Sequence, residues 1–155
     1  METLTLEQLA PYLPYGIPAK LSQKGIFNQD DEYPNPRTKE IGIIKNISFW
    51  YPEITGQLHI SETYSFDFDE IDEVDILLRP LTDLTKEIEH KGERLCVMSI
   101  LFPMLETHSV LLDVIPDKAE DILIPLISNN NMLNVLLKYH FDVFGLIEKG
   151  LAISY

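Results

Sequence analysis

HFDVFGLIEKGLAI (residues 140–153) is the C-terminal stretch on which we expect the rest of the chain to close. Its apolar residues outnumber its charges, so we expect it to dock against a core. Asp142 can cap a short helix by accepting hydrogen bonds from the N–H groups of the next turn. Gly150 suits the end of that helix, because glycine readily adopts positive φ.

The whole chain has 155 residues and is 45% hydrophobic, which predicts one domain, residues 1–155, with a sizeable core. The N-terminus shows no secretory signal. The longest mainly apolar run, Leu95 to Leu105, is far shorter than the ~20 residues that span a bilayer. Cys96 is the one cysteine, which fits a reducing compartment. We therefore expect a soluble cytoplasmic protein with no membrane partner.

Strand patterns dominate the first half, after a capping box at Thr5 to Gln8 and a short helix that Pro11 and Pro14 stop. The segment from Gln57 to Phe68 alternates, with Leu58, Ile60, Tyr64, Phe66 and Phe68 on one face. Residues 51–56 can join it to the preceding strand as a hairpin loop. The strands predicted here are 19–23, 41–51, 57–68 and 74–78, with an exposed loop over 28–37.

Helical patterns dominate the second half. Thr82 or Asp83 can cap a helix to about His90 that ends at Gly92. A buried strand is expected over 94–101, and periodicity leaves 110–115 open between strand and helix. Further helices are predicted from Pro116, with an interruption at Pro125, and over 132–141. This segregation predicts an α+β fold, an antiparallel sheet from the N-terminal half packed against helices from the C-terminal half.

The charge is −13, from 25 acids and 12 bases, and it is unevenly placed. No Lys or Arg lies between Lys45 and Arg79, while eight acids do. Such a chain should repel nucleic acid and anionic membranes, because phosphate binding needs clustered cations. Six of these acids stand close together: Asp67, Asp69, Glu70, Asp72, Glu73 and Asp75.

This run of acids has three interpretations. The run does not match an EF-hand calcium loop, since the fifth and twelfth positions of the loop would be Ile71 and Leu78. A looser metal site with Asp67, Asp69 and Asp72 would make the protein a metal-dependent enzyme. Carboxylates along an extended edge, roughly 6.6 Å apart at alternate residues, could instead mimic nucleic-acid phosphates and bind a basic protein. The plainest alternative is a solvated surface that serves solubility.

Other chemistry has little support in the residues. The Leu95-Cys96-Val97 context favours a buried thiol, and no nucleophile motif joins Cys96 to His108 or His140. The histidines lack zinc spacing and the glycines form no phosphate loop. Trp50 and Tyr51 could anchor a partner or lie in the core at a strand end. We predict no catalytic residue, no metal and no cofactor.

Three segments carry a resemblance: LTLEQLAPYLPYG (4–16), LRPLTDLTKEI with the following Gly92-Glu93, and residues 140–153. Together they resemble small proteins of Bacteroidetes phages and prophages. The resemblance implies no activity and no site residue. It implies a phage context, in which small acidic proteins often bind host or phage machinery, and hence the cytoplasm of the bacterial host.

The sequence therefore favours a non-enzymatic, phage-type acidic binding protein that engages a basic, nucleic-acid-handling protein. The expected partner-binding residues are Asp67, Asp69, Glu70, Asp72, Glu73, Asp75, Trp50 and Tyr51. The alternatives are the metal-dependent enzyme and a self-assembling phage accessory protein, which would form homo-oligomers.

Overall fold

A capped turn of helix opens the described part of the chain. The computed structural model describes residues 4–23, 40–50, 53–62, 64–106 and 130–154. The Thr5 N–H donates to Gln8 Oε1 at 2.9 Å, as the capping box predicts. Helix α1, Leu6–Leu9, ends just before Pro11, and the 3₁₀ turn η1 (Leu13–Tyr15) follows.

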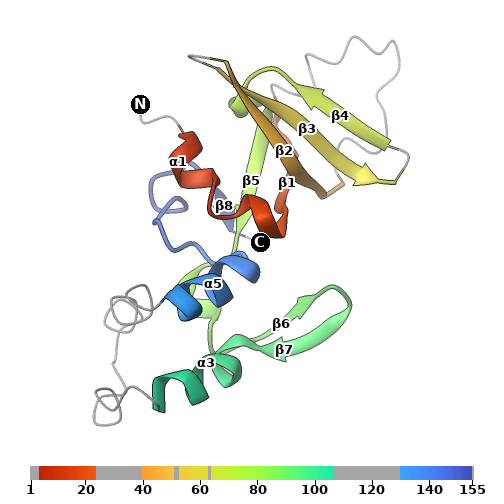
Figure 1. The fold of residues 1–155 in the computed structure, drawn as a ribbon. Coiled ribbons are helices and arrows are strands. Elements are labelled where there is room, and N and C mark those ends of the chain that lie inside the picture. Colours follow the sequence, from red (N-terminus) through yellow and green to blue (C-terminus); the bar gives the residue numbers. More distant parts are fainter. Residues whose placement is uncertain (1–3, 24–39, 51–52, 63, 107–129, 155) are drawn as a thin grey trace. The chain divides into compact units, whose positions relative to one another are not determined.

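Three strands then form an antiparallel meander: β2 (Gly42–Trp50), β3 (Glu53–Ser61) and β4 (Tyr64–Phe68) (Figure 1). The predicted strand over 57–68 is therefore two strands, and the predicted loop over 51–56 is mostly strand. The predicted alternation is confirmed at Leu58, Phe66 and Phe68, but not at Ile60, which is half-buried like His59. Leu58, Phe66 and Phe68 are buried, whereas Ser65 and Asp67 are exposed.

The meander belongs to a six-stranded sheet with the order β4-β3-β2-β1-β5-β8. Strand β1 (Ile17–Leu21) begins two residues earlier than predicted, because Gly16 makes the turn with φ 75°. Strand β5 (Val74–Leu78) has the predicted bounds and pairs antiparallel with β1. Only the two-residue β8 (Ile153–Ser154) runs parallel to its neighbour, β5. The fold is α+β with a mostly antiparallel sheet.

The segment after β5 differs from its prediction. The helix expected from Thr82 or Asp83 to His90 is wrong: a 3₁₀ turn, η4 (Leu81–Asp83), leads into strand β6 (Glu87–His90). Strand β6 pairs antiparallel with β7 (Glu93–Cys96) (Figure 1). Lys91 and Gly92, both at positive φ, form the hairpin turn. Leu84 and Ile88 are both buried, a spacing that fits a helix equally well.

Two helices follow. The predicted buried strand over 94–101 is wrong beyond Cys96, because α3 begins at Val97 and runs to Glu106. Helix α5 (Asn130–Lys138) confirms the amphipathic helix predicted over 132–141 but ends three residues earlier. His140, two residues after the helix, adopts φ 61°. The N–H groups of His140 and Phe141 donate to the carbonyls of Leu137 and Leu136 and close the helix end.

The C-terminal stretch docks as predicted but holds no helix. Phe141 and Leu146 are fully buried. Turns replace the helix expected after Asp142, and Gly145 and Gly150 take positive φ within them. The chain then enters β8, whose Ile153 lies opposite Leu77 of β5.

By packing, the chain divides into two compact units. One comprises Met1–Leu78 with Phe144–Tyr155 and holds the six-stranded sheet; the other is Arg79–Val143 and holds β6, β7, α3 and α5. The single domain and the packing of the sheet on C-terminal helices stay predictions. The predictions for residues 28–37, 110–115 and the helix from Pro116 lie outside the described residues.

Candidate functional site

The run of acids lies where β4 leaves the sheet and the chain returns to β5. Asp67 is exposed on β4, Asp69 and Glu70 are exposed in the bend after it, and Asp72 is exposed in the 3₁₀ turn η3 (Ile71–Glu73). We call these four residues the acidic turn. Its local cause is the buried Phe68, which holds the end of β4 in the core while the next residues reverse direction.

Glu73 does not belong to that surface. It is only 9% exposed, and its carboxylate accepts a hydrogen bond from the Asp69 N–H at 3.1 Å. The side chain therefore closes the turn from inside by satisfying a backbone donor. The bond shapes the acidic turn, and the predicted contact of Glu73 with a partner stays a prediction.

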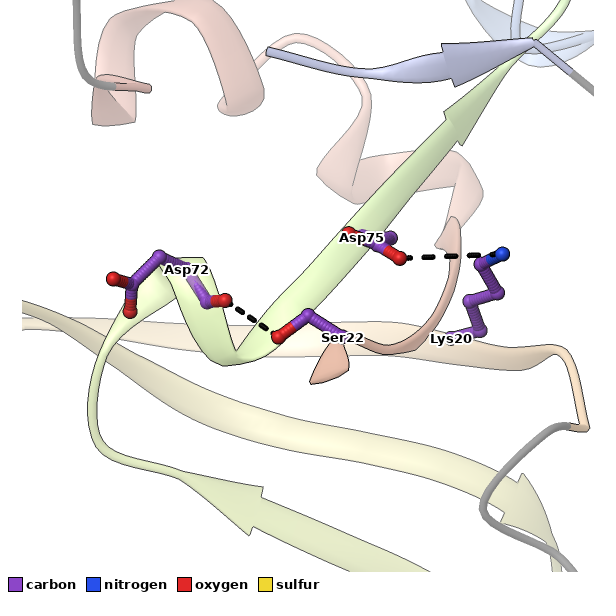
Figure 2. A network of polar contacts seen from close by, with 4 residues as sticks. All are labelled: Lys20, Ser22, Asp72 and Asp75. Atoms are coloured by element: carbon purple, nitrogen blue, oxygen red, sulfur yellow. Dashed lines mark hydrogen bonds and ion pairs between the residues drawn. The ribbon is translucent and has the colours of Figure 1, made fainter. Parts of the chain in front are cut away.

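Asp75 lies on β5 and faces a cation. It stands directly opposite Lys20 of β1, and its carboxylate is 4.0 Å from the Lys20 ammonium (Figure 2). At this separation and exposure the pair is weak, since surface ion pairs contribute about 0–1 kcal/mol. Asp75 is thus half-buried and partly neutralised, and it lies on β5 rather than in the acidic turn.

The acidic turn is tied to the sheet by two hydrogen bonds, one to its backbone and one to a side chain. The Ser22 hydroxyl donates to the Asp72 carbonyl at 2.6 Å, and Figure 2 shows the Asp72 carboxylate turned away from this bond. Asp67 accepts a hydrogen bond from Gln57 Nε2 at 2.8 Å, across the β3–β4 pair. These bonds hold the turn while its carboxylates face outward.

The regular spacing expected of a phosphate mimic is not present beyond Phe68. Strand geometry ends there, so Asp69 and Asp72 lie in a bend and a 3₁₀ turn rather than along an extended edge. The extended edge that the phosphate-mimic interpretation requires does not continue to Glu73, because Glu73 folds back on the Asp69 N–H. What remains is a local cluster of exposed carboxylates.

The other predicted residues fare differently. Tyr51 and the side chain of Trp50 lie outside what the structure describes, so their role stays a prediction. Among the described residues no group of three or more His, Cys, Asp or Glu side chains is arranged to hold a metal ion, and this includes Asp67, Asp69 and Asp72. Cys96 is half-buried, with its thiol 3.5 Å from the Leu84 carbonyl, and His108 is not described.

The sequence analysis did not predict two features of the structure. In the unit Arg79–Val143, the His90 ring packs edge-on against Tyr139 with centroids 4.9 Å apart, and His140 lies 5.8 Å away. Burial and, to a lesser degree, the charges of Lys91, Arg79 and Lys138 lower the pKa of His90. No signal in the sequence joins His90 to a helix some fifty residues later.

The second feature is a groove beside β5, in the unit that holds the sheet. Its volume is about 240 Å³. Ile71, Asp72 and residues 74–76 line one side, and residues 150–153 line the other. The groove is mainly apolar with two carboxylates, and one of these, Asp72, also belongs to the acidic turn.

Within the described residues, no helix is long and apolar enough to cross a membrane. Comparison with known protein families, with curated proteins and with solved structures found no match to this chain.

Proposed function

We propose that this protein is a non-enzymatic binding protein of phage or prophage type, which engages a basic protein through the acidic turn. The observation that carries the proposal is the local charge: Asp67, Asp69, Glu70 and Asp72 are all exposed within six residues. No Lys or Arg follows Lys45 in the sequence until Arg79. Asp75, the next acid, already faces Lys20 and adds less.

Four carboxylates this close produce a negative potential that is stronger and reaches further than that of a single charge. Such a field steers a cationic partner and speeds its association, and salt weakens it beyond a Debye length of about 8–10 Å. Complementary charge of this kind improves specificity and the association rate more than affinity. Salt-sensitive capture is therefore the expected signature.

Nucleic-acid-handling proteins are the proposed partner class, because they present clustered Lys and Arg for phosphates. The bacterial cytoplasm is the proposed compartment. The carboxylates of the acidic turn are grouped rather than evenly spaced, so the proposal is for a basic patch on a protein, rather than for a long groove that reads a regular ladder of charges.

The experiment compares two variants with equal charge. The first carries Asp67→Asn, Asp69→Asn, Glu70→Gln and Asp72→Asn, which changes the net charge from −13 to −9. The second carries Glu87→Gln, Glu89→Gln, Glu93→Gln and Glu148→Gln, at four exposed acids elsewhere, and has the same net charge. Immobilised protein captures partners from bacterial lysate at low and at high salt, and mass spectrometry identifies them.

The expected result is capture of proteins of high isoelectric point by the unmodified chain and by the second variant, at low salt only. The first variant should lose them, while circular dichroism shows that it is folded. Equal loss by both variants would show that net charge alone binds cations, and the proposal would then fail.

A further inference from the structure

The groove beside β5 is short and closed at one end. On the β1 side of β5, residues 74–76 are paired with residues 19–21, and on the other side β8 pairs with Leu77 and Leu78. Ile153 lies directly opposite Leu77, so the chain itself fills the edge of β5 at this end. The space beside residues 74–76, about 240 Å³, therefore suits a compact molecule rather than a further strand.

The walls of the groove are mainly apolar. Ile71, Val74 and Ile76 contribute to one wall, and Leu151 and Ile153 contribute to the other. An apolar protein cavity of ~150 Å³ holds one benzene molecule. The groove, at about 240 Å³, therefore has room for one ring or a short hydrocarbon chain with a polar group attached.

The polar groups of the groove are mainly hydrogen-bond acceptors. Asp72 and Asp75 both line it. The Ser22 N–H donates to the Glu73 carbonyl at 2.8 Å, so the Glu73 carbonyl faces β1. Successive residues of a strand alternate in this direction, so the Val74 carbonyl faces the groove. An ammonium group fits such a set, because it carries three donors and no acceptor.

The charge of the groove also favours a cation. Among the described residues that line it, two are acids and none is Lys or Arg. The nearby Lys20 ammonium is 4.0 Å from the Asp75 carboxylate, and both side chains are partly exposed, so this ion pair is weak (Figure 2). A second ammonium that lies against the apolar wall is less hydrated and would interact more strongly with Asp75.

We propose that this groove binds a small organic amine in its protonated form, in which a primary ammonium is attached to a compact apolar body. The body lies between the apolar walls, the ammonium meets Asp75 and the Val74 carbonyl, and Asp72 adds negative potential. The inference goes beyond the proposed function and does not depend on it, because the ligand is a free small molecule rather than a protein.

The test uses the full chain and three probes. 2-Phenylethylamine carries both features, 2-phenylethanol carries the body without the charge, and ethylamine carries the charge with almost no body. NMR follows each titration at two backbone amides, those of Ile76, whose N–H faces the groove, and of Ala152 in the opposite wall. 2-Phenylethylamine should shift both amides and bind about tenfold more tightly than either control.

Three variants separate the charge of the groove from its shape. Asp75→Asn should weaken binding of 2-phenylethylamine about tenfold and leave that of 2-phenylethanol unchanged. Lys20→Gln should strengthen binding of the amine, because it removes the cation that competes for Asp75. Glu148→Gln is the matched control: it removes one exposed acid of the same compact unit, outside the groove, and should change binding by less than about twofold.

Equal binding of 2-phenylethylamine and 2-phenylethanol would overturn the inference, and so would equal losses in Asp75→Asn and Glu148→Gln, because the groove would then select no cation. Failure of millimolar 2-phenylethylamine to shift the amides of Ile76 and Ala152 would also overturn it. Tighter binding of Nα-acetyl-lysine methylamide than of 2-phenylethylamine would assign the groove to a lysine of a protein partner, against the free amine proposed here.

Discussion

At the scale of single residues, His90 is the titratable group, among those that the structure describes, whose surroundings most clearly disfavour its charge. Its ring packs on Tyr139, and Arg79, Lys91 and Lys138 contribute positive potential. Burial acts first and these charges second, and both lower its pKa below the ordinary 6.5. Protonation at this position therefore favours the unfolded chain.

We predict the pH dependence from this direction. Well above pH 6.5 the His90 imidazole is neutral in both the folded and the unfolded state, so its protonation costs the folded state no stability. As the pH falls through 6.5 toward the lower folded pKa, the unfolded state binds the proton first and stability is lost. His90→Gln should reduce the loss of stability between pH 7 and pH 5, measured by urea unfolding.

Lys91→Gln is the companion variant, because it removes one of the charges that lower the pKa and keeps the ring. This variant should reduce the loss of stability between pH 7 and pH 5 by less than His90→Gln does. A profile of His90→Gln that matches the unmodified chain would show that other groups control stability in this range.

Glu73 and Asp72 show that two acidic neighbours in the sequence can have different environments in the fold. Glu73 and Asp72 are neighbours in a run of acids, yet one carboxylate bonds the Asp69 N–H inside the turn and the other faces outward. Residue type alone assigns both to one surface. Their separation follows from the 3₁₀ turn Ile71–Glu73, which directs successive side chains to different sides.

At the scale of elements, the β6–β7 hairpin depends on its two-residue turn. Lys91 has φ 54° and Gly92 has φ 83°, which is the geometry that matches the twist of paired strands. A Cβ placed at Gly92 would meet no atom within 4 Å. The effect of a substitution there is therefore limited to the backbone conformation.

Gly92→Ala should lower the free energy of unfolding by about 1 kcal/mol, the cost of positive φ for an L-residue. Lys91→Asn should raise the free energy of unfolding by a few tenths of a kcal/mol, since asparagine tolerates positive φ better than lysine. Chemical denaturation of the three proteins measures both. A neutral Gly92→Ala would mean that the hairpin is not held in this turn.

The same hairpin explains the failure of the helix predicted over 82–90. Leu84 and Ile88 are spaced for one helix face, and Gly92 suits a helix end, so local patterns allow either structure. The strand forms because Ile88 finds Leu95 as its cross-strand partner. Such a pair is worth about 0.2–1 kcal/mol and depends on residues that come later in the chain.

At the scale of the whole molecule, a charge of −13 places the chain under self-repulsion. The acidic turn concentrates part of this repulsion, and Lys20 lies beside Asp75 on β5. Neutralising the turn should therefore stabilise the chain at low salt, even as it removes the proposed partner surface.

The variant with all four acidic-turn carboxylates neutralised should melt about 2–4 °C higher than the unmodified chain at low salt. The difference should vanish at high salt, because screening removes the repulsion. The variant at Glu87, Glu89, Glu93 and Glu148, with the same net charge, should gain less, since only three of its acids share one hairpin. Calorimetry at two salt concentrations measures the melting temperatures, and a difference that persists at high salt would point to packing instead.

The features that could be predicted from local patterns lie within short stretches. The capping box at Thr5, the bounds of β5 and the burial of Leu58, Phe66 and Phe68 all follow from local patterns. Each depends on hydrogen bonds within one turn or on the two-residue period of a strand, so no distant partner is needed.

Which acids remain on the surface, and where the sheet stays open, depend on contacts between distant parts of the chain. Glu73 is buried because the chain reverses between β4 and β5, and Asp75 meets Lys20 because β1 lies beside β5. The groove lies beside residues 74–76 of β5, with which no described residue of β8 pairs. These features arise from pairings between strands far apart in the chain, whose register depends on the whole fold and is not encoded in any one segment.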